Sequence, residues 1–254
     1  MRTSPDLRAL AQGAADVLAR LRAKPPRVHC ITNSVAQNFT ANVLLALGAQ
    51  PSMTISPEEI GHFAGDADAL LVNLGTFDRE RAEAIDIAVA SANDAKRPWV
   101  LDPVLIDRSP PRTGLARALL KRKPAALRLN AAEFAALSGG QPPADFAAAN
   151  STVVALSGAT DIVVGNGREA SLANGHPLMA RVTAMGCAGS ALVAACLAVE
   201  SDALLAIVAG MSILGVAGEI AGEVSQGPGS FAVAILDALY RLEPDVLAAR
   251  AKVS

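Results

Sequence analysis

The chain has 254 residues, of which 52% are hydrophobic and 18% are charged, so it holds enough apolar material for one large core. Its 22 basic and 24 acidic residues give a formal net charge of -2, and aromatic residues make up only 3% of the sequence. This composition supplies neither a cationic surface for phosphates nor rings for base stacking, which argues against nucleic-acid binding. We expect a single domain over residues 1–254.

The first predicted element is an amphipathic helix. Ser4 and Pro5 offer a cap and a first turn, and apolar residues then recur with helical spacing from Leu7 to Leu21. This start lacks the uninterrupted apolar run of a signal peptide. We therefore expect no export.

The cysteines give a second indication of the compartment. Cys30, Cys187 and Cys196 are odd in number and have no CxxC spacing, which argues against a disulfide framework and a structural zinc site. A reducing cytoplasm is the expected location.

Short apolar runs follow along the chain, several of them separated by helical stretches. Each run is too short for a helix, and the alternation is typical of βαβ units. We expect an α/β fold with a mostly parallel sheet and helices on both faces. A small hairpin over residues 172–176, after Gly165-Asn166-Gly167, should lie at one edge. The predicted strands are residues 28–31, 69–74, 99–101, 125–129, 152–156 and 161–164.

Three apolar helices are predicted at the end of the chain, over residues 188–199, 204–223 and 231–242. The uncharged stretches 182–199 and 203–218 are at or below the length that crosses a bilayer, and glycines interrupt them. Buried helices, without membrane association, are the expected outcome.

Polar residues directly follow five of the predicted strands. In an open parallel sheet, ligands bind beyond the carboxyl ends of the strands. A single Asn or Asp at such a place can instead cap the next helix, but the recurrence favours a shared site. The residues are Thr32-Asn33, Asn73 with Gly75-Thr76, Asp102-Pro103, Asn130 with Glu133, and Ser157-Gly158.

Residues 183–190 form a small, glycine-containing segment before an apolar helix. The N–H groups of such a turn and the helix dipole favour an anion, whereas the alternative is a packing junction where small residues permit close contact. The segment is not a Walker A loop, because no Gly-Lys-Ser/Thr follows it. At this position the dipole should lower the thiol pKa of Cys187 somewhat.

Candidate groups for phosphate chemistry lie after the strands. Asp102 and Glu133 are candidates to hold Mg²⁺, which usually takes one or two carboxylates together with substrate phosphates. Arg128 offers a forked donor to a phosphoryl group, or alternatively forms an ion pair that stabilises the strand ends. His29, inside the first strand, is expected to be a hydrogen-bonded core histidine.

A series of motifs runs through the chain in a fixed order, from about Val28 to Tyr240. The motifs are VHCITN at 28–33, NFTAN at 38–42, LLALGA at 44–49, PSM at 51–53, NLGT at 73–76, LDPV at 101–104, RLNAAE at 128–133, NGHPL at 174–178 and GPGSF at 227–231. This series resembles the hydroxyethylthiazole kinase family. The resemblance implies a ribokinase-like three-layer α/β/α sandwich without a lid, the use of ATP and Mg²⁺, and a homotrimer with active sites between subunits.

The resemblance also implies roles for individual residues. Cys187 would face the acceptor hydroxyl, in the catalytic turn that includes Gly186. Met53, Asn33 and Ala184 would lie on the thiazole side. Arg128 and Ser157 would meet ATP, and Glu133 and Asp102 would hold the metal.

The sequence departs from the family pattern near the phosphate turn. The usual Thr-Gly-Thr-Gly-Cys reads TAMGC at 183–187, so Ala184 adds a methyl group and Met185 removes a hydroxyl; Leu129 replaces the glycine of Arg-Gly-Asn. The predicted function is ATP-dependent phosphorylation of 4-methyl-5-(2-hydroxyethyl)thiazole in thiamine salvage. The alternatives are a related kinase for another small alcohol, such as a hydroxymethylpyrimidine, and a ligand-binding pseudokinase.

Overall fold

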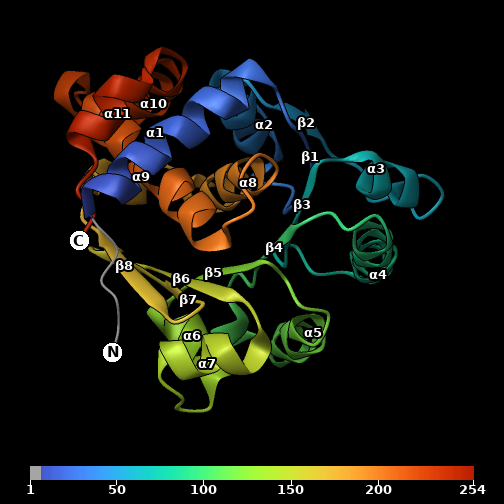
Figure 1. Cartoon of the computed structure of the whole chain (residues 1–254). Helices are drawn as coiled ribbons and strands as arrows, with labels where there is room; N and C mark the ends of the chain where they lie inside the picture. Colours follow the sequence, from blue (N-terminus) through green and yellow to red (C-terminus); the bar gives the residue numbers. More distant parts are fainter. Residues whose placement is uncertain (1–6) are drawn as a thin grey trace.

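The computed structural model describes residues 7–254 and shows a twisted sheet with helices on both faces (Figure 1). The first helix, α1 (Leu7–Ala23), is amphipathic as predicted and buries Leu10, Val17 and Leu21. The predicted Ser4-Pro5 start lies outside the described residues.

All eight named strands form one sheet in the order β2-β1-β3-β4-β5-β6-β7-β8. The pairs from β2 to β6 are parallel, whereas β7 pairs antiparallel with β6 and β8 pairs antiparallel with β7. Residues 7–254 form no strands outside this sheet that could serve as a separate lid. The strands are β1 (Arg27–Ile31), β2 (Gln50–Ser52), β3 (Ala69–Asn73), β4 (Trp99–Asp102), β5 (Ala126–Asn130), β6 (Val153–Ser157), β7 (Asp161–Gly165) and β8 (Arg168–Leu172).

Successive strand residues point to opposite faces, so the sheet separates two hydrophobic cores. On β3, for example, Leu71 packs into one core and Leu70 into the other. The α8-side core lies under α1, α2 (Gln37–Leu47), α8 (Met185–Leu197), α9 (Ala203–Val224), α10 (Pro228–Arg241) and α11 (Pro244–Arg250). The α4-side core lies under α3 (Ile60–Asp66), α4 (Arg79–Asp94), α5 (Pro110–Leu120), α6 (Ala131–Ser138) and α7 (Pro143–Asn150). The three-layer α/β/α prediction is confirmed.

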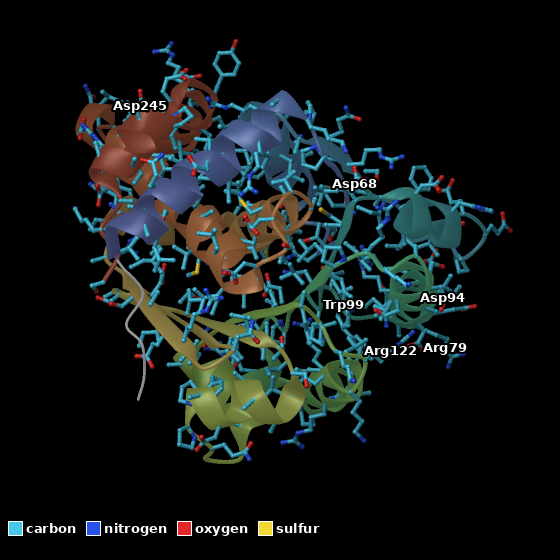
Figure 2. All side chains as sticks on the ribbon, in the orientation of Figure 1. Asp68, Arg79, Asp94, Trp99, Arg122 and Asp245 are labelled. Atoms are coloured by element: carbon cyan, nitrogen blue, oxygen red, sulfur yellow. The ribbon has the colours of Figure 1, made fainter. Side chains whose placement is uncertain are left out.

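The helix α9 is long and apolar enough to cross a membrane, but 78% of its most apolar window is buried inside the protein. It packs against α1, α8 and α10. Charged side chains such as Arg79 and Asp245 project instead from the outer helices (Figure 2). The prediction of buried helices is therefore confirmed for α8 and α9.

Two local predictions differ from the structure. The return strand of the hairpin is β8, which begins and ends four residues earlier than the predicted 172–176, because Asn166 (φ 53°) and Gly167 (φ 73°) complete a two-residue turn. Residues 173–176 leave the sheet as a loop. The short edge strand β2 was not predicted, since Pro51 within a run of three residues gives little strand signal.

Candidate active site

Three polar side chains meet at the carboxyl edge of the sheet: Asn73 and Asp102 end β3 and β4, and Asn33 lies two residues after β1. Asn33 Nδ2 donates to Asn73 Oδ1 (3.3 Å), and Asn73 Nδ2 donates to Asp102 Oδ2 (2.8 Å). Gly75 permits this approach, because a β-carbon there would lie 2.6 Å from Asn33 Cβ. The sheet thus brings Asn33 and Asp102 into one network and joins them through Asn73.

The first turn of α8 carries free N–H groups beside this network. The first helical hydrogen bond runs from Ala188 N to Ala184 O (2.8 Å), so the N–H groups of Met185, Gly186 and Cys187 have no acceptor within the helix. Ala184, the N-cap, has φ 67°, a left-handed conformation that favours glycine. Free N–H groups and the helix dipole make this end suitable for an anion.

Arg128, on β5, connects α8 with the sheet. Its Nη1 donates to the Gly186 carbonyl (2.8 Å) and to Ser190 Oγ (3.4 Å), and Ser190 Oγ donates to Asp102 Oδ2 (2.7 Å). Gly189 leaves room for the guanidinium, since a β-carbon there would lie 3.3 Å from Arg128 Nη2. Arg128 forms no ion pair with a carboxylate of residues 7–254. The side chain therefore keeps donors for a ligand.

The Cys187 thiol is half-buried and accepts a hydrogen bond from Asn33 Nδ2 (3.2 Å). Burial raises its pKa to about 11, and the nearby Asp102 carboxylate adds to this increase. The prediction of a lowered thiol pKa was wrong, because desolvation and a like charge outweigh the helix dipole. Cys187 is a neutral thiol at physiological pH.

Asp102 is almost completely buried, with 5% of its surface exposed. Burial raises the pKa of its carboxyl to about 6, although Arg128 and the hydrogen bond from Ser190 act in the opposite direction. The charge of Glu133 raises the pKa further. The site therefore holds a carboxyl that is costly to ionise in the absence of a cation.

Glu133 is also buried and serves as a backbone acceptor. Its Oε2 accepts from Asn130 N (2.9 Å) and its Oε1 from Leu105 N (2.8 Å), while Glu133 N donates to Asn130 Oδ1 (3.0 Å). Asn130 and Glu133 thus form the capping box of α6, so the alternative reading of Asn130 as a helix cap is correct.

Asp102 and Glu133 are the carboxylates of the site that could hold Mg²⁺. No group of three or more His, Cys, Asp and Glu side chains able to hold a metal occurs among the described residues. Mg²⁺ usually needs only one or two carboxylates together with waters and phosphates. Asp102 and Glu133 interact electrostatically as like charges, and a shared cation relieves this repulsion. The pair fits Mg²⁺.

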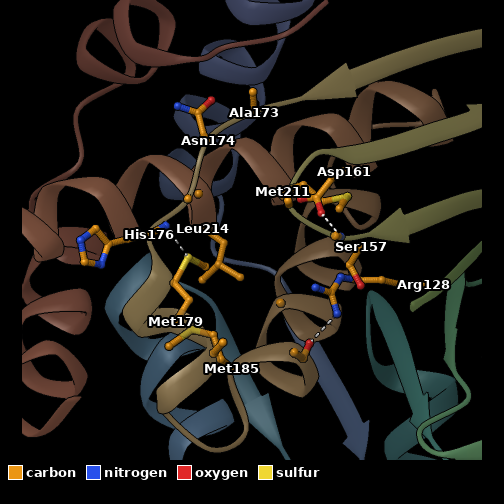
Figure 3. Close-up of a pocket in the computed structure, with 18 of the residues that line it drawn as sticks. Arg128, Ser157, Asp161, Ala173, Asn174, His176, Met179, Met185, Met211 and Leu214 are labelled. Atoms are coloured by element: carbon orange, nitrogen blue, oxygen red, sulfur yellow. Dashed lines mark hydrogen bonds between the residues drawn. The ribbon is translucent and has the colours of Figure 1, made fainter. Parts of the chain in front are cut away.

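A pocket of about 650 Å³ opens next to Arg128, between the β6–β7 turn, the loop after β8, and the helices α8 and α9 (Figure 3). Polar side chains occupy the wall that includes Arg128, Ser157 and Asp161, while Met179, Met211 and Leu214 provide apolar surface. Ser157 Oγ donates to the Leu129 carbonyl (3.3 Å). The volume is in the range of small-ligand sites.

Met53 lies apart from this pocket. It follows the edge strand β2, packs against the α8-side core, and does not line the cavity. His29 is fully buried, with Nδ1 2.8 Å from Ser52 Oγ and Nε2 3.2 Å from the Thr54 carbonyl, so it is a core histidine as predicted. Burial lowers the pKa of His29 to about 4.

The departures from the family pattern fall at different depths. Leu129 is buried in the α4-side core, so this replacement of a glycine does not enter the pocket. Met185 does line the pocket and packs into the α8-side core at the same time. The replacement at 185 therefore changes a cavity wall, whereas the one at 129 changes the core.

Sequence reasoning did not assign roles to Ser190 and Asp161. Ser190 lies inside the small-residue segment, where its serine is one of several residues that suit close packing. Asp161 begins a strand, whereas the sequence signal for a site lies in polar residues that follow strands. Only the folded chain places them at the site.

Comparison with known proteins gives a consistent result. Residues 18–145 and 143–245 match the model of the "HK: Hydroxyethylthiazole kinase family". The chain is 44% identical over 265 aligned positions to a hydroxyethylthiazole kinase of Pectobacterium atrosepticum, covering 98% of this chain and 100% of that protein. It is 47% identical over 238 positions to a hydroxyethylthiazole kinase of Klebsiella pneumoniae, covering 87% and 92%.

Solved structures agree with the sequence matches. The hydroxyethylthiazole kinase protein of Pyrococcus horikoshii superposes with a TM-score of 0.90 at 37% identity, over 95% of this chain and 98% of that chain. A ribokinase-like superfamily protein from Enterococcus faecalis, 13% identical, superposes with a TM-score of 0.66 over 94% and 90% and shows the shared fold. Because sequence and structure match over nearly the whole length, the chain belongs to the hydroxyethylthiazole kinase family.

Proposed function

We propose that the pocket and the adjoining polar network are the active site in which this chain phosphorylates hydroxyethylthiazole with ATP. Family membership gives the chain the family's phosphotransferase activity in thiamine metabolism. The observation that carries the assignment is the contact between Arg128 and the Gly186 carbonyl, which brings a guanidinium without a carboxylate partner among the described residues to the N-terminal end of α8. Phosphoryl transfer requires mainly such positioning and charge stabilisation.

The nucleotide phosphates would lie between Arg128, Ser157 and the first turn of α8. Arg128 has an unpartnered Nε among the described residues, and Ser157 has a hydroxyl on the pocket wall. Met185 and Gly186, in the first turn of α8, line the same cavity. Arg128 and the N–H groups of this turn supply donors for the charge that spreads over the transferred group.

The acceptor alcohol would lie beside Cys187, with Asn33 and Ala184 on the substrate side. Its oxygen attacks the γ-phosphorus, the bond from that phosphorus to the ADP oxygen breaks, and the alcohol proton is released. Loose transition states of this kind need little prior deprotonation of the nucleophile. A neutral thiol with a pKa of about 11 therefore orients the alcohol through a hydrogen bond instead of removing its proton.

Asp102 and Glu133 would hold Mg²⁺, which neutralises phosphate charge when it is bound with the nucleotide. Glu133→Gln should lower turnover sharply and raise the Mg²⁺ concentration required for half-maximal rate. Unchanged kinetics across a Mg²⁺ titration would remove Glu133 from the metal site.

Met53 and the edge strand β2 support a homotrimer with shared active sites. Exposed apolar side chains occur near β2 and on the adjacent helices, including Leu45 (58% exposed) and Val233 (64% exposed). A second subunit at this edge would cover them and complete the thiazole side near Met53. Light scattering tests this assembly, and an active monomer would refute the shared site.

One assay tests the function as a whole. Purified protein is supplied with Mg-ATP and a panel of thiazole and pyrimidine alcohols, and the phosphorylated product is measured. Preferential phosphorylation of the hydroxyethylthiazole supports the proposal. Preference for a hydroxymethylpyrimidine, or ligand binding without turnover, would replace it with one of the alternatives. The three cysteines Cys30, Cys187 and Cys196 form no disulfide, which is consistent with a protein of the reducing cytoplasm.

A further inference from the structure

The pocket has one carboxylate whose partners inside the protein leave an oxygen free. Asp161 Oδ1 accepts from Gly158 N (2.8 Å), whereas its Oδ2 has no partner among the described residues. Asn174, in contrast, is fully engaged: its Nδ2 donates to Glu219 and to the Arg250 carbonyl, and its Oδ1 accepts from Lys252 N. Asp161 is therefore the pocket's available acceptor-only side chain.

Asp161 lines the same cavity as Arg128 and Ser157. Burial raises the pKa of Asp161, while the Gly158 hydrogen bond and the positive charge of Arg128 act in the opposite direction, so Asp161 and Arg128 lie within electrostatic reach. Asp161 is also paired in register with Leu172, directly before the loop that forms another part of the wall. In Figure 3 it lies beyond Ser157 as seen from Arg128, close to Met211.

The chemistry of a nucleotide limits what this carboxylate can meet. Phosphates carry no donors and are repelled by a carboxylate, so they belong at the Arg128 end. The base suits the apolar surface of Met179, Met211 and Leu214. The ribose connects these two parts, and its hydroxyl groups are donors.

We propose that Asp161 accepts a hydrogen bond from a ribose hydroxyl and thereby makes the enzyme selective for ribonucleotides over deoxyribonucleotides. The inference rests on the proposed function, because it takes ATP as the occupant of the pocket. The Gly158 N–H bond holds the carboxylate in place before binding, so little side-chain freedom is lost. A deoxynucleotide leaves this partly buried acceptor without its donor.

The test measures binding without turnover. Dissociation constants are determined by calorimetry for a non-hydrolysable ATP analogue and for its 2′-deoxy and 3′-deoxy forms, with wild type and Asp161→Asn. Wild type should prefer the ribose form over at least one deoxy form by about tenfold, or ~1.4 kcal/mol. In Asp161→Asn this preference should fall to about one, because the asparagine keeps the Gly158 contact and loses the charged acceptor. Thermal unfolding verifies that the variant is folded.

Two further arms identify other roles of Asp161. An inosine analogue tests for contact with the base amino group, and a Mg²⁺ titration tests for a metal ligand. Equal weakening of all nucleotides, or a loss confined to the base analogue, would overturn the inference. Thr160→Ala, an exposed residue of the same turn that does not line the pocket, is the matched control and should leave the ribose preference unchanged.

The outcomes for the inference and for the proposed function are separable. A wild type that binds every nucleotide without ribose preference overturns the inference alone. A wild type that binds none of them overturns the nucleotide assignment of the pocket, and the inference with it.

Discussion

Ser190 donates a 2.7 Å hydrogen bond to Asp102 and at the same time lies 3.4 Å from the Arg128 guanidinium, so one hydroxyl joins a buried carboxylate to the cation of the pocket. Ser190→Ala should reduce kcat/KM by roughly tenfold, because both charged groups lose a positioning contact. The buried Ser212, whose Oγ has no partner among the described residues, is the matched control, and Ser212→Ala should leave activity unchanged. Equal rates for the two variants would show that the Ser190 contact has no role in turnover.

Asp102→Asn should increase the stability of the protein at pH 7 and lower its activity. The folded protein holds the Asp102 proton up to about pH 6, whereas an unfolded aspartate releases it near 3.8. The free energy of unfolding therefore falls as pH rises through this window, and the ionised carboxyl costs about 3 kcal/mol at pH 7 without metal. The variant should unfold at higher denaturant concentration at pH 7 and lose most of its turnover. A variant that is both less stable and fully active would contradict this reading.

His29 should produce the opposite pH dependence. An unfolded histidine takes up a proton near pH 6.5, whereas burial keeps His29 neutral down to about pH 4. The free energy of unfolding therefore falls as pH drops from 6.5 to 4. His29→Gln should remove this decrease in the free energy of unfolding at low pH. The decrease at higher pH that Asp102 causes should remain. Urea titrations at half-unit pH steps measure it, and an unaltered profile would exclude His29 as its source.

The loop that carries Met53 depends on the same histidine. Because His29 contacts Ser52 and the Thr54 carbonyl, its replacement should raise KM for the thiazole alcohol more than it lowers kcat. Steady-state kinetics at saturating Mg-ATP distinguish the two effects.

Another polar side chain should be able to take over the role proposed for Cys187, which is to orient the acceptor alcohol. Cys187→Ser should retain measurable transfer, since a neutral hydroxyl can orient the alcohol as the neutral thiol does. Cys187→Asp should preserve or improve transfer by supplying an ionised acceptor, provided that Mg²⁺ and Arg128 offset the like charge of Asp102. Cys196, fully buried on the same helix, is the control, and Cys196→Ala should not alter the rate of phosphoryl transfer. Complete loss in both Cys187 variants, as folded proteins, would show that the thiol takes part in the chemistry.

Ala184→Gly should increase stability modestly. The N-cap of α8 has φ 67°, where an alanine is strained by roughly 1 kcal/mol and a glycine is not. Part of this gain is offset by the greater freedom of glycine in the unfolded chain, so about 0.5 kcal/mol should remain. Denaturant unfolding measures it, and a destabilised variant would contradict the strain argument.

The sequence predicted the position of a site residue best where that residue lies at the end of a strand. Asn33 and Asp102 follow apolar runs directly, and parallel pairing then necessarily brings them to one edge. Burial, in contrast, depends on the packing of distant helices, so the pKa of Cys187 was predicted in the wrong direction. The roles assigned to the site residues, including Met53, stay predictions. The single-domain assignment also stays a prediction.

The division of the sheet into two cores has a consequence for the order of synthesis. The α4-side core contains buried residues between Ile31 and Val164, whereas the α8-side core joins Leu10 to residues as late as Leu247. As the chain leaves the ribosome, one face of the sheet can be covered while the other waits for α8 to α10. A nascent chain of about two thirds of the length thus exposes apolar surface on its α1 and α2 side, and this intermediate is the species that chaperones would need to protect.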